Sequence, residues 1–320
     1  MKVRREFIAL ATALAAMYAV SLLTGRLFFN PLHPSGIDKA LVLEARAPRA
    51  LAAVLTGASL GAAGVCFQMV FRNYLAGPNI LGVTSGSAFG AAIAILLLPP
   101  SPSIVQIVSF AFGLTAVLTA CWLSRLVGGD TLALILSGIV VSALFSAGIG
   151  VVKYVADPYN KLPAIVYWLL GSLAGVRWSD LLYPTPPMLA GVVGVLLLRW
   201  VLNIVSLGDE EALSLGLRVG FYKTLCILLA TLATSAATSI MGMVAWVGVV
   251  SPHIARLAVG HDCRRLAPAS ILVGSMLMLA CDDIARSAYV CELPLSVVTS
   301  LVGAPVLFAI LARRRILHAE

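Results

Sequence analysis

Two acids in the C-terminal half of the chain are the residues best placed for chemistry. Asp282 and Asp283 lie inside an otherwise apolar run, and Arg286 follows about one helical turn later. Such acids can relay protons, or they can form a salt bridge that tethers the end of a helix. His253 lies in a second apolar stretch, where an isolated histidine more often packs and caps than catalyses. The sequence leaves the proton relay and the structural salt bridge both open.

Motifs for phosphate and metal chemistry are absent from the sequence. It contains no GxxxxGK[ST] loop for nucleotide phosphates and no HExxH zinc motif. The six cysteines form no CxxC pair, and four of them lie in apolar runs, where cysteine packs as a small apolar residue. We therefore expect no catalytic residues, no disulfide framework and no metal site, and hence a protein that is not an enzyme.

The composition indicates which elements must position these residues. Apolar residues make up 60% of the chain and charged residues 11%, with a mean hydropathy of +1.00, whereas soluble domains carry about 25% charge. This excludes a soluble enzyme and predicts an all-α polytopic protein of the lipid bilayer. The net charge of +8 fits basic loops on the cytoplasmic side. The basic residues are scattered, so they do not form the stripe that nucleic acid would require.

Uncharged runs predict about ten membrane-spanning helices, since about 20 apolar residues cross the hydrocarbon core. The run 73–124 is broken by Pro99-Pro100-Ser101-Pro102 and therefore predicts two helices and a hairpin. The run 224–255 is too long for one span, and we divide it near Gly242. Segment 162–176 is short and predicts a re-entrant or interfacial helix. The remaining predicted spans are 7–25, 50–71, 131–152, 181–198, 267–288 and 293–312.

Ten crossings would place both termini on the same side of the membrane. If that side is the cytoplasm, most of the 22 Lys and Arg residues fall in cytoplasmic segments, as the positive-inside rule requires. Lys2, Arg4 and Arg5 resemble the start of a signal peptide. A 19-residue apolar run followed by nine further spans instead predicts a first transmembrane helix.

A long loop at about 206–220 contains a candidate partner-binding helix. Asp209 can cap a short helix, Glu210 and Glu211 suit its positive end, and Gly216 can terminate it. Its side chains Ala212, Leu213 and Leu215 are available to a cytoplasmic partner, or they pack on the bundle.

Ser251 and Pro252 favour a helix start inside an apolar run, because serine caps helices and proline suits the first helical position. A helix that begins at membrane depth is typical of the broken helices of transporters. A simple kink at Pro252 is the alternative.

An ordered series of motifs from about residue 40 to 315 resembles one protein family. The series comprises Arg46-Ala47-Pro48-Arg49, Gly57-Ala58-Ser59-Leu60-Gly61, Gln68, Phe71 to Pro78, Gly208 to Ala212, Ser251 to Arg256, Asp282 with Arg286, Glu292-Leu293-Pro294 and Gly303-Ala304-Pro305. Together these resemble the permease subunits of type II ABC importers for iron-siderophores, haem and vitamin B12. Tyr74 departs from the family's usual Asn-Pro-Leu-Ala, and Ser296 stands where a Gly is usual.

The resemblance implies a single transmembrane permease domain over residues 1–320, a vitamin B12 permease-like bundle of ten helices, some short or broken. It implies a homodimer with the path at its axis, two ATP-binding cassette subunits on the cytoplasmic side and an extracytoplasmic substrate-binding protein. The cargo would be a metal chelate, either an iron-siderophore, haem or cobalamin. The chain would lie in a prokaryotic cytoplasmic membrane and hold no cofactor, since ATP and Mg would bind the partner ATPase.

The resemblance also assigns roles to residues at matching positions. It places binding-protein docking on Arg46, Arg49 and Arg286, where a guanidinium group can pair with a carboxylate. The ATPase-coupling residues would be Gly208, Asp209, Glu210, Glu211, Ala212, Leu213, Leu215 and Gly216. The structural or gating candidates are Gln68, Asn73, Pro78, Pro252, His253, Arg256, Asp282, Pro294 and Pro305. The alternative function is an ion-coupled secondary transporter, which would work without an ATPase.

Overall fold

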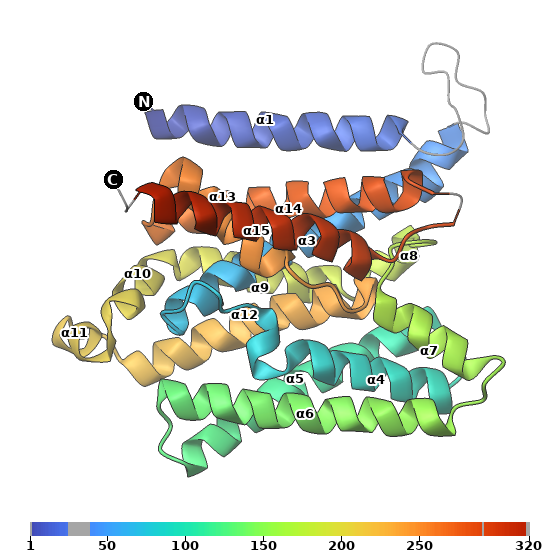
Figure 1. The fold of residues 1–320 in the computed structure, drawn as a ribbon, viewed down its shortest axis with the longest axis horizontal. Helices are drawn as coiled ribbons and strands as arrows, with labels where there is room; N and C mark the ends of the chain where they lie inside the picture. The colour runs from blue at the N-terminus through green and yellow to red at the C-terminus, as the bar shows by residue number, and fades with distance from the viewer. Residues whose placement is uncertain (1, 25–38, 290, 318–320) are drawn as a thin grey trace.

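Long uncharged runs form long helices here because a helix satisfies every backbone polar group within its own segment. The computed structural model describes residues 2–24, 39–289 and 291–317, and the helices run roughly alongside one another (Figure 1). The elements are α1 (Lys2–Leu23), η1 (Leu41–Arg46), α3 (Ala47–Val70), η2 (Pro78–Leu81), α4 (Val83–Leu97), α5 (Pro102–Leu126), α6 (Thr131–Val155), α7 (Lys161–Leu170), α8 (Trp178–Leu181), α9 (Thr185–Leu197), α10 (Arg199–Leu207), α11 (Asp209–Ser214), α12 (Val219–Met241), α13 (Val247–Val259), α14 (Cys263–Ser287) and α15 (Leu295–Leu317).

Each of the ten predicted spans corresponds to a helix, although the helices differ in length. Within the described ranges six are long and apolar enough to cross a membrane, and the pair α9–α10, bent by 59°, makes a seventh. The spans α4, α13 and α15 have shorter apolar stretches. The predicted short helix is α7, with 10 residues. The last residue of the first predicted span, Gly25, lies outside the described residues.

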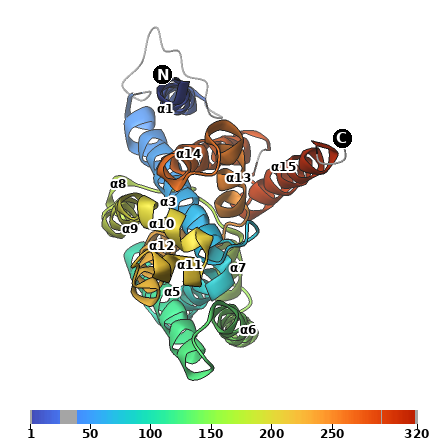
Figure 2. The same cartoon turned by 90° about the vertical axis from the view of Figure 1, so that its left-hand side faces the viewer.

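The central helix of the bundle is α3, which is surrounded by α9, α12, α13 and α14 (Figure 2). Its small residues let neighbouring backbones approach closely. A Cβ added at Gly64 would lie 1.7 Å from the Gly248 carbonyl oxygen of α13, and one at Gly61 would lie 2.2 Å from the Ser270 oxygen of α14. The glycines of α3 therefore permit the packing that buries this helix.

The two ends of the bundle carry different elements. The first residues of α1, the last turns of α15 and the short helix α11 gather at one end, here called the α11 end (Figure 1). The helices α7 and α8 lie at the opposite end, here called the α8 end (Figure 1). The first turn of α1 and the last turns of α15 thus share an end with the predicted partner-binding helix.

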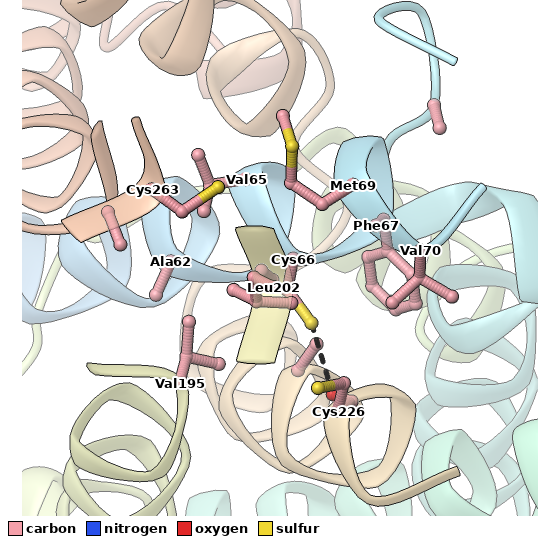
Figure 3. Close-up of a cluster of buried hydrophobic side chains, with 14 of the residues drawn as sticks. Ala62, Val65, Cys66, Phe67, Met69, Val70, Val195, Leu202, Cys226 and Cys263 are labelled. Carbon is pink, nitrogen blue, oxygen red and sulfur yellow. Dashed lines mark hydrogen bonds between the residues drawn. The ribbon is translucent and has the colours of Figure 1, made fainter. Parts of the chain in front are cut away.

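Cysteines contribute to the apolar core between α3, α12 and α14 (Figure 3). Cys66, Cys226 and Cys263 are buried beside Phe67 and Leu202, and the Cys66 thiol donates a hydrogen bond to the Cys226 carbonyl oxygen at 3.2 Å. All six cysteines, each of which the structure describes, are free thiols. The buried thiols therefore pack as small apolar side chains.

The predicted helix start at Ser251 is wrong, because α13 begins at Val247 and Pro252 lies inside it. Ser251 Oγ donates to the Val247 carbonyl oxygen at 2.7 Å, so the side chain bonds backward instead of capping. The helical structure is interrupted earlier, between Gly242 (φ 76°) and Trp246 (φ 71°). Since proline has no N–H, Pro252 leaves the Gly248 carbonyl without its usual helical donor, and this carbonyl faces Gly64.

Candidate functional site

A buried ion-pair network lies at the α8 end and centres on Arg49. Its guanidinium group contacts both carboxylate oxygens of Asp282, with Nη2–Oδ1 at 2.9 Å and Nε–Oδ2 at 3.0 Å, and Nη1 contacts Glu292 Oε1 at 2.8 Å. Asp282 is fully buried, and Arg49 is 9% exposed. Buried charges require such partners, because removing them from water carries a large desolvation cost. The network joins the start of α3 to the last turns of α14.

A second pair lies one residue further along α14. Arg286 forms an ion pair with Asp283 and donates hydrogen bonds to the backbone and hydroxyl of Ser21 on α1. The predicted pairing of Arg286 with one of the two acids is thus confirmed for Asp283, whereas Asp282 pairs with Arg49. Both acids are neutralised by arginine, which favours the structural salt bridge over the proton relay.

Arg46 completes the cluster by binding the end of α1. Its Nη1 donates to the carbonyl oxygens of Leu22 and Leu23, both at 3.0 Å. The last carbonyls of a helix lack intrahelical donors, and Arg46 supplies one from a neighbouring element. All three arginines predicted to dock a binding protein therefore hold helices together.

The same three arginines line a pocket of about 310 Å³ at the α8 end, here called the arginine pocket. Arg177, which is exposed, and the carboxylates of Glu44 and Glu292 also line it. The arginines predicted for docking are 5–9% exposed, so they form the inner wall of a pocket and do not project from the surface. Their role in docking stays a prediction.

The predicted coupling helix exists as α11, with two corrections at its beginning. The N-cap is Gly208 (φ 138°), and Asp209 is the first helical residue. The Asp209 carboxylate does not cap; it binds Lys223 Nζ of α12 at 2.7 Å. Glu210 and Glu211 lie in the first turn, as predicted, and Asp209 joins them there.

The end of α11 is a Schellman motif built on Gly216. Leu217 N–H donates to the Ala212 carbonyl at 3.0 Å, Gly216 N–H donates to Leu213 at 2.8 Å, and Gly216 has φ 80°. The predicted termination at Gly216 is confirmed. Ala212 is fully buried and packs on the bundle, one of the two alternatives, while Leu213 and Leu215 are 61% and 63% exposed.

A second set of contacts fixes α10, which leads into α11, to the first residues of α14. Asn203 Nδ2 donates to Asp262 Oδ1, and Asn203 Oδ1 accepts from Cys263 N–H, both at 2.7 Å. Arg264 binds the Asp262 carboxylate at 3.0 Å, and its guanidinium lies 4.9 Å from the centre of the Trp200 ring. The hydrogen bonds from Arg264 and Asn203 lower the pKa of Asp262 to about 2. These contacts and the Asp209–Lys223 pair connect α10 and α11 to α14 and α12.

Four residues from α3, the 71–78 loop and α13 meet in a polar cluster. Gln68 Oε1 accepts a hydrogen bond from Arg256, and Gln68 Nε2 donates to the Val249 carbonyl at 3.2 Å. His253 Nε2 lies 2.9 Å from the Tyr74 carbonyl oxygen. The Arg256 guanidinium lies 4.4 Å from the centre of the Tyr74 ring, a cation–π contact. Tyr74, which departs from the family pattern, thus holds its loop on α13.

The other gating candidates lie in turns or helix interiors. Asn73 Oδ1 accepts from Leu75 N–H at 2.9 Å, which stabilises the same loop. Pro78 begins η2 and packs against Gly248. Pro294 precedes α15, whose Leu295 N–H donates to the Gly171 carbonyl at 3.0 Å, and Pro305 lies inside α15.

No sequence motif pointed to Lys223, Asn203 or Trp246. Lys223 and Asn203 looked like ordinary loop-flanking polar residues, and their partners Asp209 and Asp262 are 14 and 59 residues away. Trp246 has the left-handed φ that a bulky residue rarely adopts, and no sequence pattern signals such a strain. Among the described residues, no three His, Cys, Asp or Glu side chains are arranged to hold a metal ion.

A bundle of apolar helices with a broken segment at residues 242–246 is typical of polytopic membrane transporters. The FecCD transport family matches residues 7–313, and the chain belongs to this family.

Individual relatives agree with this assignment. The chain is 38% identical over 276 residues to the molybdate import system permease protein MolB of Haemophilus influenzae, covering 86% of this chain and 81% of MolB. It is 36% identical to the hemin transport system permease protein HmuU of Yersinia pestis, covering 85% and 83%. A solved ABC transporter described as metal-chelate type, in an inward-facing conformation, superposes with a TM-score of 0.90 at 35% identity, covering 96% of this chain and 98% of the other.

Proposed function

We propose that this permease is the membrane-spanning subunit of an ATP-driven importer for a metal chelate, either an iron-siderophore, haem or cobalamin. The observation that supports it most directly is the exposed helix α11 on a FecCD-family bundle, at the end that carries both termini. Two copies of the chain would form the path, and an extracytoplasmic binding protein would deliver the chelate. The relatives' names include molybdate, an oxyanion outside this class, as well as hemin, so their names do not single out one cargo.

In this proposal the energy comes from ATP hydrolysis by a separate ATPase that binds α11. The exposed Leu213 and Leu215 offer an apolar contact, and the Asp209–Lys223 ion pair fixes the helix to α12. The sequence has no phosphate-binding loop of its own, so ATP and Mg would bind the partner. The acids that could couple transport to ions, Asp282 and Asp283, are paired with arginines, which disfavours the secondary-transporter alternative.

The α11 end would face the cytoplasm of a prokaryotic cell, with both termini on that side. The α8 end would face outward and meet the binding protein. Four arginines and two glutamates line the arginine pocket, and Asp282 and Asp283 balance Arg49 and Arg286. An acidic partner would therefore meet chiefly the exposed Arg177 at the rim.

The test is ATP-dependent uptake by proteoliposomes that contain the permease, its ATPase and its binding protein. Replacing Leu213 and Leu215 with Glu should abolish uptake and ATPase copurification while leaving the fold intact. The matched control is Tyr159→Glu, which changes an 87% exposed residue outside this helix and should leave ATPase copurification unchanged. Full ATP-dependent uptake by the double variant would refute the role of α11. Uptake by the wild-type chain with an ion gradient and no ATPase would refute the proposed function itself.

Docking at the arginine pocket is best tested at its rim. Arg177 is exposed, so Arg177→Glu should weaken binding-protein association without disturbing the buried pairs, and the loss should diminish at high salt. Equal affinity of the wild type and the variant at low salt would refute docking at this pocket.

The proposed homodimer is tested by measuring the mass of the purified complex. Native mass spectrometry of the purified complex should show two permease chains with two ATPase subunits, and a complex with one permease chain would contradict the proposal.

A further inference from the structure

A second, larger cavity of about 910 Å³ lies near the arginine pocket. It is bounded by α7, by the hairpin between α4 and α5, and by the end of α12. Gly175 and Val176 line both cavities. Its volume falls within the range of small-molecule binding sites. Among its walls, Tyr167 and Trp168 come from α7, and the prolines come from the hairpin and from α7, namely Pro99, Pro100, Pro102 and Pro163.

Gln106 on α5 is a polar residue in this mostly apolar wall. It is 6% exposed, and its Oε1 has no hydrogen-bond partner within the described part of the chain. A buried amide oxygen without a partner destabilises the fold, so its presence needs a reason. The oxygen and nitrogen of an amide exchange places on rotation by 180°, so Gln106 can offer either an acceptor or donors. A hydroxyl group can complement both.

Two charged residues line the cavity, the cationic Lys161 and the acidic Asp180. Lys161 Nζ donates to the Ile95 carbonyl at 2.8 Å, which uses one of its three protons. Asp180 Oδ2 already accepts from the Arg177 N–H at 2.9 Å. The cavity therefore has a cation with spare donors, while its acid is engaged in a helix cap.

We propose that this cavity binds an aromatic molecule that carries a hydroxyl group and a carboxylate. Tyr167, Trp168 and the prolines supply flat apolar surfaces for the ring. The hydroxyl group would bind Gln106, and the carboxylate would lie near Lys161. The site is separate from the proposed transport function and does not depend on it.

The probe is 6-hydroxy-2-naphthoate, and 2-naphthoate is its matched control without the hydroxyl group. Binding is measured on the full chain in phospholipid nanodiscs through quenching of tryptophan fluorescence. The wild type should bind the hydroxylated probe about three- to tenfold more tightly, the contribution of one net hydrogen bond. Gln106→Leu should remove this preference. Trp168→Phe should reduce the quenching, which assigns the signal to this cavity.

Two further variants make the test specific. Ser109→Ala removes another buried polar group of α5 that does not line the cavity, and it should keep the preference for the hydroxylated probe. Lys161→Gln should weaken binding of both naphthoates but leave neutral 2-naphthol unchanged.

Equal affinity of the two naphthoates for the wild type would overturn the proposal, as would an unchanged preference in Gln106→Leu. Binding in detergent that phospholipid abolishes would identify a lipid crevice and would also overturn it. If Gln106→Leu does not fold, the wild-type comparison and Lys161→Gln decide the outcome.

Discussion

Replacing Asp282 with alanine would remove three of the four hydrogen bonds that Arg49 makes to carboxylates. Breaking a buried ion pair by removing one partner costs about 3–5 kcal/mol of unfolding free energy. Asp282→Ala should lie at the lower end of this range, because Glu292 still accepts a bond from Arg49 at 2.8 Å. Arg49→Met should lie at the upper end, because it leaves the fully buried Asp282 carboxylate without its bidentate partner.

The double variant Arg49→Met/Asp282→Ala separates the pair from its surroundings. It removes both charges, so its cost should be well below the sum of the single costs. The expected coupling energy is about 2 kcal/mol or more, above the roughly 0.5 kcal/mol within which independent sites add. The free energy of unfolding is measured by titrating the permease from mild micelles into dodecyl sulfate and following tryptophan fluorescence.

The matched control is the exposed pair Asp262–Arg264, whose side chains are 30% and 56% exposed. The same cycle there should give a coupling energy of about 0–1 kcal/mol, as for surface ion pairs. Additive costs at Arg49 and Asp282 would refute the buried network as the element that joins α3 to α14.

Three further predictions concern packing, pH and the polar cluster. Gly64→Ala should destabilise the bundle by several kcal/mol, since its Cβ would lie 1.7 Å from the Gly248 oxygen, while Gly150→Ala, with open space around it, should be neutral in the same unfolding assay. Because the pKa of Asp262 is lowered to about 2, its stabilising effect should be present above about pH 4 and lost as the pH falls toward 2. The wild type should therefore exceed Asp262→Asn in stability at neutral pH, by less than about 1 kcal/mol, and a difference that grows on acidification would contradict this. Tyr74→Ala should lower stability by about 0.5–2 kcal/mol and Tyr74→Phe should not, because phenylalanine keeps the ring beneath Arg256; equal losses would contradict the cation–π contact.

Local chemistry explains which site features the sequence predicted correctly. Gly216 terminates α11 because glycine adopts φ 80° without a steric penalty. The acids in its first turn follow the helix dipole. Asp283 pairs with Arg286 because residues three apart share a helix face. The two failures have different causes. Asp209 binds Lys223, a residue 14 positions away, and therefore does not cap its helix. Ser251 lies inside a helix that starts four residues earlier, at Val247, and bonds back to the Val247 carbonyl.

The sequence by itself determined the membrane class, the approximate number of spans and the breaks at Pro99–Pro102 and Gly242, because the hydrocarbon core admits only uncharged helical runs of sufficient length. Its motif series also indicated the family. The tertiary structure alone decided which charges meet. Arg49, Asp282 and Glu292 are brought together across separations of 233 and 243 residues, and Gln106 borders a cavity formed by three distant segments. Such contacts depend on how closely the helices pack around α3. Small residues on several helices set this spacing jointly, so the sequence of any single helix does not reveal it.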